Sequence, residues 1–190
     1  MSSPRPAKRC CAAPGRRRLL AVMISAAAIG AWPARAAEGP GRRLVLMNTH
    51  TGERLDTVYR VEAGYLPAEL GRLDWMLRDH RTGAVIPLDA RLFDLLHELA
   101  QAAGVEPRYQ VISGYRSPAT NAMLAATTDG VSSRSLHMEG KAVDVRLEGV
   151  ALAKLRELAL ARAAGGVGYY PASDFVHLDL GRVRSWSGQA

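Results

Sequence analysis

The sequence contains almost no cysteine and no apolar segment long enough to cross a membrane. Its 190 residues include only two cysteines, Cys10 and Cys11, both near the N-terminus. The rest of the chain must therefore fold without disulfide bonds. The apolar run over residues 19–30 falls well short of the ~20 residues that a membrane-spanning helix needs. These absences exclude a disulfide-stabilised scaffold and predict no stable membrane insertion.

Acidic residues are missing from one end of the chain, because the first carboxylate is that of Glu38. Seven of the 25 Lys and Arg residues precede it, so the remaining 18 balance the 18 Asp and Glu residues. The formal net charge of +7 is therefore a property of the N-terminal segment. A neutral body lacks the clustered basic surface with which proteins bind nucleic acid, and we expect no nucleic-acid partner.

The N-terminal segment has the order of features found in an export signal. A cationic stretch precedes the apolar run, and Ala34-Arg35-Ala36 supplies the small residues of a cleavage site. Arg16-Arg17 followed by apolar residues fits the twin-arginine pattern, although general secretory signals are also rich in arginine. We therefore expect a signal peptide over residues 1–36, export to the periplasm by either route, and one mature domain over residues 37–190.

The mature segment mixes strands and helices without strict alternation. Turn residues and alternating apolar positions predict strands over residues 43–48, 54–61, 108–113, 141–147, 167–170 and 175–180. Apolar spacing and capping residues predict helices over residues 67–80, 87–103, 118–126 and 150–163. This order favours an α+β fold in which helices pack on one side of a mostly antiparallel sheet.

Two of the late strands place reactive side chains opposite rows of aliphatic residues. Asp144 and His177 have this position in their strands, and a turn at Glu139-Gly140 can bring His137 back beside Asp144. Two imidazoles and one carboxylate suit a catalytic zinc ion with a coordination position left for water. The same donors occur in non-haem iron(II) oxygenases, and any one of them alone is more often an ordinary surface group.

The remaining histidines, His50, His80 and His97, lie in a turn, at a helix end and on a helix. The sequence assigns them no role.

The residues around the three candidate ligands resemble a known family. The motif is Ser135-x-His137-x-x-Gly140-x-Ala142-x-Asp144, followed by Asp174-x-x-His177. It is similar to that of the zinc D-Ala-D-Ala carboxypeptidase (LAS) metallopeptidases. Residues 113–117 and 181–186 are similar to the narrower YcbK-like murein endopeptidases, and the resemblance extends over residues 42–186.

This resemblance implies a hedgehog/D-Ala-D-Ala-peptidase-like fold and hydrolysis of peptide cross-links in peptidoglycan. It also implies one Zn²⁺ per chain, bound by His137, Asp144 and His177. The expected partner is the peptide stem of peptidoglycan, and the protein is expected to be a monomer. The sequence leaves open which cross-link is cleaved, D-Ala to diaminopimelate or diaminopimelate to diaminopimelate.

Two further residues receive catalytic roles from the resemblance. It makes Asp174 the general base, whereas strand alternation favours Asp179, which faces the same side as His177. The conflict disappears if Asp174 lies in a turn before the strand, and Asp179 then supports the metal site or the fold. Arg116 lies at a strand-to-helix junction, where the resemblance implies that it binds a substrate carboxylate or a developing oxyanion.

Three alternatives to a murein endopeptidase stay open at this point. The first is a D,D- or L,D-carboxypeptidase of the same family. The second is an iron(II) oxygenase that uses the same His, Asp and His donors. The third is a non-catalytic, zinc-stabilised module that binds the cell wall.

Overall fold

The computed structural model describes residues 41–127 and 132–188, so the expected signal peptide lies outside the described residues. The strands are β1 (Arg42–Asn48), β2 (Arg54–Val61), β3 (Gly64–Tyr65), β4 (Arg108–Ser113), β5 (Ala142–Leu147), β6 (Gly166–Tyr170), β7 (Phe175–Asp179) and β8 (Arg184–Ser187). The helices are α1 (Pro67–Met76), α2 (Ala90–Ala103), α3 (Pro118–Thr127) and α4 (Leu152–Arg162), with a 3₁₀ helix η1 (Leu136–Glu139). None of the helices described is both long and apolar enough to cross a membrane.

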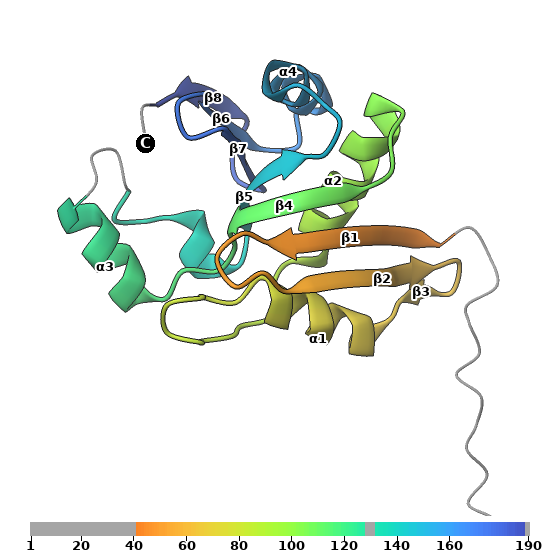
Figure 1. Cartoon of the computed structure of the whole chain (residues 1–190), viewed down its shortest axis with the longest axis horizontal. Coiled ribbons are helices and arrows are strands. Elements are labelled where there is room, and N and C mark those ends of the chain that lie inside the picture. The colour runs from red at the N-terminus through yellow and green to blue at the C-terminus, as the bar shows by residue number, and fades with distance from the viewer. Residues whose placement is uncertain (1–40, 128–131, 189–190) are drawn as a thin grey trace, which may run out of the picture. The chain divides into compact units, whose positions relative to one another are not determined.

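All these strands belong to one sheet with the order β3-β2-β1-β4-β5-β7-β6-β8. Figure 1 shows β1, β2 and β4 side by side, with β5 continuing the sheet toward β7, β6 and β8. The pairs β1–β4 and β6–β8 are parallel, and the other neighbouring strands are antiparallel. The predicted α+β fold with a mostly antiparallel sheet is confirmed.

The hydrophobic core lies between one face of the sheet and the helices α1, α2 and α4, which contact the sheet. In α2, Leu92, Leu96 and Leu99 recur at helical spacing and are buried. Val143 and Val145 of β5 point into the same core. Because side chains alternate along a strand, Asp144 and Arg146 must lie on the opposite face of the sheet, which we call the open face although Asp144 itself is buried.

Three predicted helices are shorter than the sequence suggested: the helix predicted over residues 150–163 spans Leu152–Arg162, and a local aspartate limits each of the other two. The helix predicted over residues 67–80 ends at Met76, because the carboxylate of Asp79 accepts hydrogen bonds from the backbone N–H groups of Arg81 and Thr82 and forms a turn. The helix predicted from residue 87 begins at Ala90, because Asp89 is its N-cap and accepts a hydrogen bond from the N–H of Arg91. In both cases a local aspartate sets the helix end.

Candidate metal centre

Three side chains converge where β5 and β7 pair. The antiparallel register places Asp144 directly opposite His177, so both side chains lie on the open face. Oδ1 of Asp144 lies 2.8 Å from Nδ1 of His177 and 3.2 Å from Nε2 of His137. The two histidine nitrogens are 3.1 Å apart. Three potential ligand atoms therefore surround one point.

His137 reaches this point because η1 reverses the chain just before β5. The hydroxyl of Ser135 accepts a hydrogen bond from the N–H of His137 at the start of η1. Gly140 ends the turn with φ +66°, a left-handed conformation that favours glycine. The sequence prediction that Glu139-Gly140 returns His137 to the strand of Asp144 is confirmed.

The hydrogen bonds of the outer ring nitrogens determine the tautomers of the two histidines. Nδ1 of His137 lies 2.6 Å from the carbonyl oxygen of Gly114, and Nε2 of His177 lies 3.2 Å from Oδ2 of Asp179. Both oxygens accept, so the outer nitrogens carry the protons. In the neutral rings, the lone pairs of His137 Nε2 and His177 Nδ1 then face the centre, as metal binding requires.

Asp179 supports His177 and is itself fixed by several hydrogen bonds. It is almost fully buried, and its Oδ1 accepts hydrogen bonds from the backbone N–H groups of Gly166 (2.9 Å) and Gly181 (2.7 Å). Arg184 adds an ion pair at 2.7 Å to Oδ2. Burial alone would raise the pKa of Asp179, but the hydrogen bonds from His177 and these groups lower it below its ordinary value.

The three inner atoms fit a zinc ion. Tetrahedral zinc with ligand bonds of about 2.0–2.2 Å holds its ligands roughly 3.3–3.6 Å apart. The separations here, 2.8, 3.1 and 3.2 Å, are slightly shorter, so small side-chain shifts would admit the ion. Burial lowers the pKa of His137. Burial would raise the pKa of Asp144, but His137 and His177 outweigh it and the pKa falls. These shifts favour the unprotonated forms of His137 and Asp144 that bind metal.

Arg116 contacts the centre through Asp144. Its Nη2 bonds to Oδ2 of Asp144, the oxygen that faces away from the two histidines, and its Nε donates to the hydroxyl of Ser113 at 2.9 Å. Nη1 of Arg116 has no partner in the described ranges. Arg116 therefore orients a candidate metal ligand and keeps one donor group for another molecule.

Asp174 lies in the turn between β6 and β7 with φ +53°, as the sequence prediction of a turn position required. Its side chain is 64% exposed, and Oδ2 is 2.9 Å from Nε of Arg146. Arg146 follows Asp144 by two residues and points to the same open face. Asp174 is thus held by Arg146, two residues along β5 from Asp144, and its role as a base stays a prediction.

The sequence did not predict the contacts of Trp186, His50 and His80, although Trp186 lies within the family-like residues 181–186. Trp186 of β8 stacks obliquely on His177 with the ring centroids 5.3 Å apart, and its Nε1 donates to the hydroxyl of Tyr170. His50 and His80 stack on each other near Arg116. His97 lies elsewhere and bonds to the carbonyl of Arg43. No signal in the sequence brings these partners together.

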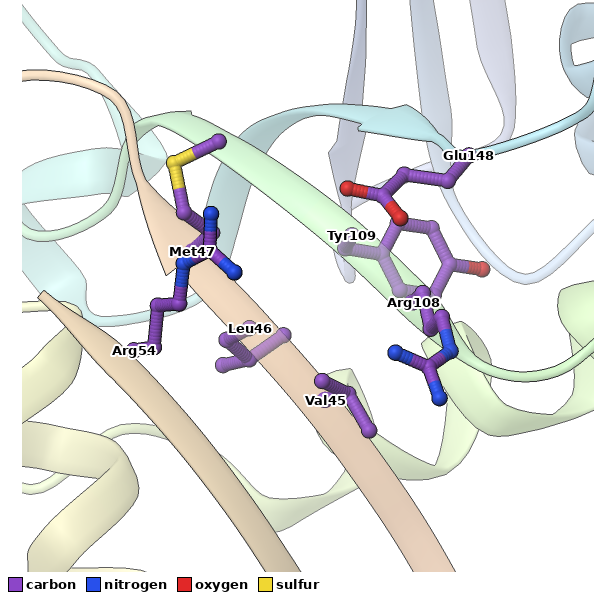
Figure 2. A pocket seen from close by; sticks show the side chains of 7 residues that line it. All are labelled: Val45, Leu46, Met47, Arg54, Arg108, Tyr109 and Glu148. Atoms are coloured by element: carbon purple, nitrogen blue, oxygen red, sulfur yellow. The ribbon is translucent and has the colours of Figure 1, made fainter. Parts of the chain in front are cut away.

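The metal centre does not coincide with the small cavity on the open face. That cavity has a volume of about 60 Å³ and lies over β1 and β4, as Figure 2 shows. Its lining residues are Val45, Leu46, Met47, Arg54, Arg108, Tyr109 and Glu148. None of the three metal-binding candidates lines it: His137 and Asp144 are almost fully buried, and the side chain of His177 is 12% exposed.

Comparison with known proteins matches the sequence of the chain to one family. The sequence model of the family described as "Peptidoglycan L,D-endopeptidase MepK" matches residues 35–186. The chain belongs to this family. The resemblance to murein endopeptidases, predicted from the motifs, is confirmed, and the assignment to a zinc metallopeptidase group is confirmed with it.

Curated members of the MepK family are similar to the chain over most of its length. Peptidoglycan L,D-endopeptidase MepK of Escherichia coli (strain K12) is 43% identical over 175 residues, which cover 90% of this chain and 96% of the relative. A probable peptidoglycan L,D-endopeptidase MepK of Haemophilus influenzae is 43% identical over 148 residues, or 77% of this chain and 80% of the relative. No solved structure gives a significant match.

Proposed function

We propose that this protein is a zinc-dependent peptidoglycan endopeptidase that cleaves the cross-link between two diaminopimelate residues. The observation that carries the proposal is the convergence of the metal-binding atoms of His137, Asp144 and His177. The relatives are named L,D-endopeptidases, and this name gives the type of bond that we propose is cleaved. A diaminopimelate-to-diaminopimelate link joins an L-centre carbonyl to a D-centre amine, whereas a D-Ala to diaminopimelate link joins two D centres.

The described contacts explain how the ligands would be positioned for this reaction. Zinc bound here would polarise the scissile carbonyl and lower the pKa of a water molecule to around 7. Gly114 and Asp179 hold the two histidine rings in the metal-binding tautomer. Arg116 holds the far oxygen of Asp144. Each ligand therefore has a partner that orients it, as in most protein zinc sites.

The proton transfers are assigned to Asp174. Its exposed carboxylate can take a proton from the attacking water and deliver it to the nitrogen of the leaving amine. The ion pair with Arg146 limits where this carboxylate can move. Asp179 is unsuited to the same task, because its oxygens are occupied by His177, Arg184 and two backbone N–H groups.

We assign to Arg116 the binding of negative charge on the substrate. Two of its nitrogens are committed to Ser113 and Asp144, and Nη1 can donate to a carboxylate of the substrate or to the oxyanion that develops during hydrolysis. Its place next to Asp144 puts this donor beside the metal centre.

Digestion of purified sacculi tests the proposal. Zinc-loaded protein is expected to convert muropeptides with diaminopimelate-to-diaminopimelate links into monomers and to leave D-Ala links intact, as identified by mass spectrometry. The His177→Ala protein serves as the inactive control. Release of only the terminal residue of monomeric stems would instead identify a carboxypeptidase, and binding without cleavage would identify a wall-binding module.

A further inference from the structure

His50 and His80 come from different parts of the chain and stack face to face. His50 lies in the turn that joins β1 to β2, and His80 follows α1. Their ring centroids are 3.9 Å apart, and the ring planes differ by 11°. His50 is exposed and His80 is half-buried, so the stack lies at the surface.

Backbone contacts of residues 112–117 fix the stack in place. The carbonyl oxygen of Ile112 lies 3.0 Å from Nε2 of His50. The N–H of Ser117 donates to Oδ2 of Asp79 at 2.9 Å, which ties down the residue next to His80. Both histidines are therefore held against the end of β4 and the start of α3.

The same segment reaches the metal centre from its other side. The carbonyl of Gly114 bonds to His137, and the side chain of Arg116 bonds to Asp144. Arg116 is also close enough to His80 to help lower the pKa of that ring. Arg116 thus belongs to the segment, residues 112–117, that contacts His50 and Asp79 on one hand and the candidate zinc ligands on the other.

Each ring offers an acceptor nitrogen. A carbonyl oxygen only accepts, so Nε2 of His50 carries the proton, and Nδ1 of the neutral ring is an acceptor. Burial, followed by the charges of His50 and Arg81, lowers the pKa of His80 to about 4, so this ring is uncharged at neutral pH. Nδ1 of His50 and both nitrogens of His80 have no hydrogen-bond partner in the part of the chain that the structure describes.

The acceptor nitrogens of the His50–His80 stack and the guanidinium of Arg116 together suit a zwitterionic group. The free centre of a diaminopimelate carries an ammonium and a carboxylate on one carbon. We propose that the His50–His80 stack binds this ammonium group while Arg116 binds the adjoining carboxylate, so that the two together form a specificity subsite for diaminopimelate. The inference rests on the proposed function, because it concerns the substrate of the same centre.

A matched pair of substrates tests the subsite. One is a diaminopimelate-linked peptide dimer with a free ammonium, and the other is the same dimer with this nitrogen acetylated. The wild-type protein is expected to prefer the free ammonium by about 10-fold in kcat/KM, the scale of one hydrogen bond to a charged group. His50→Phe and His80→Phe keep a flat ring for stacking but remove the nitrogens. Both are expected to raise KM for the free-ammonium dimer and to lose the preference without losing zinc.

His97→Ala is the control, because His97 lies outside the stack and should leave the preference intact. Variants of His50 and His80 that keep the wild-type preference would overturn the subsite, and so would a wild-type protein that cleaves both dimers equally well. If the wild type cleaves neither dimer, the proposed function itself is wrong and the subsite with it. The two failures are therefore distinguishable.

Discussion

At the scale of single residues, a partner outside the centre orients each candidate ligand. Gly114 orients His137, Asp179 orients His177, and Arg116 orients Asp144. A histidine whose outer nitrogen is bound to an acceptor presents a lone pair inward, and this is the property that a metal ion requires. Two of these three partners are side chains, and both can be changed without removing a ligand.

Removing a ligand is expected to remove the metal. His137→Ala, Asp144→Ala or His177→Ala leaves two protein donors, which are too few to hold zinc at a three-ligand site. We expect zinc content, measured by plasma mass spectrometry, to fall from about one per chain to near zero together with cross-link cleavage. His97→Ala should retain both. Equal loss of zinc in His97→Ala would show that the ligand assignment is wrong.

Changes to Asp174 and Asp179 should separate the proton-transfer role from metal support. Asp174→Ala should keep zinc and lower turnover by about 10²-fold or more, the usual effect of losing a general base. Asp179→Asn should weaken zinc affinity by about 10–100-fold, because the partner of His177 becomes a neutral amide. Two measurements distinguish these roles: muropeptide turnover at saturating zinc, and the affinity of each variant for zinc. Near wild-type turnover in Asp174→Ala would contradict the assignment of the base role to Asp174.

At the scale of elements, the short η1 helix and the register of β5 with β7 build the site. The strands deliver two ligands on one face, but His137 depends on the single left-handed residue that ends η1. Gly140 has φ +66°, and an added Cβ would lie 3.0 Å from the carbonyl oxygen of Pro87. The position of His137 is therefore sensitive to this one backbone conformation.

Gly140→Ala is expected to destabilise the protein by about 1–2 kcal/mol from the left-handed conformation alone, and to weaken zinc binding as η1 shifts. Gly71→Ala is the matched control, since Gly71 lies within α1 and nothing lies within 4 Å of its added Cβ. The free energy of unfolding of that variant should rise by about 0.5–1 kcal/mol, because alanine is the better helix former. Urea unfolding measures both, and a Gly140→Ala protein as stable as the wild type would contradict the argument.

At the scale of the whole molecule, the cationic N-terminal segment and the neutral remainder lead us to predict that the chain is cut after export. We expect the mature protein to begin close to Ala37, because the cationic stretch, apolar run and Ala34-Arg35-Ala36 occur in the order that signal peptidase recognises. N-terminal sequencing of protein from the native host checks this. Recovery of a cytoplasmic protein that keeps Met1 would contradict both the cleavage site and the periplasmic location.

Much of the fold and of the ligand set follows from the sequence alone. Alternation in β5 and β7 predicts which side chains leave the core, since successive residues of a strand face opposite sides. Glycine at residue 140 predicts a reversal of the chain, and the residue types at 137, 144 and 177 predict the metal chemistry. All of these signals are local, so they are readable without knowing the neighbours of a strand.

The tertiary structure alone decided which partners support those residues. Arg116 meets Asp144 because β4 lies beside β5, and His50 meets His80 because the end of β1 lies beside the segment that follows α1. Asp179 was ambiguous in the sequence, and its burial among backbone N–H groups now explains why its oxygens are unavailable to the substrate. Such contacts depend on strand order and register, which are set by packing of the entire core and which no local pattern encodes.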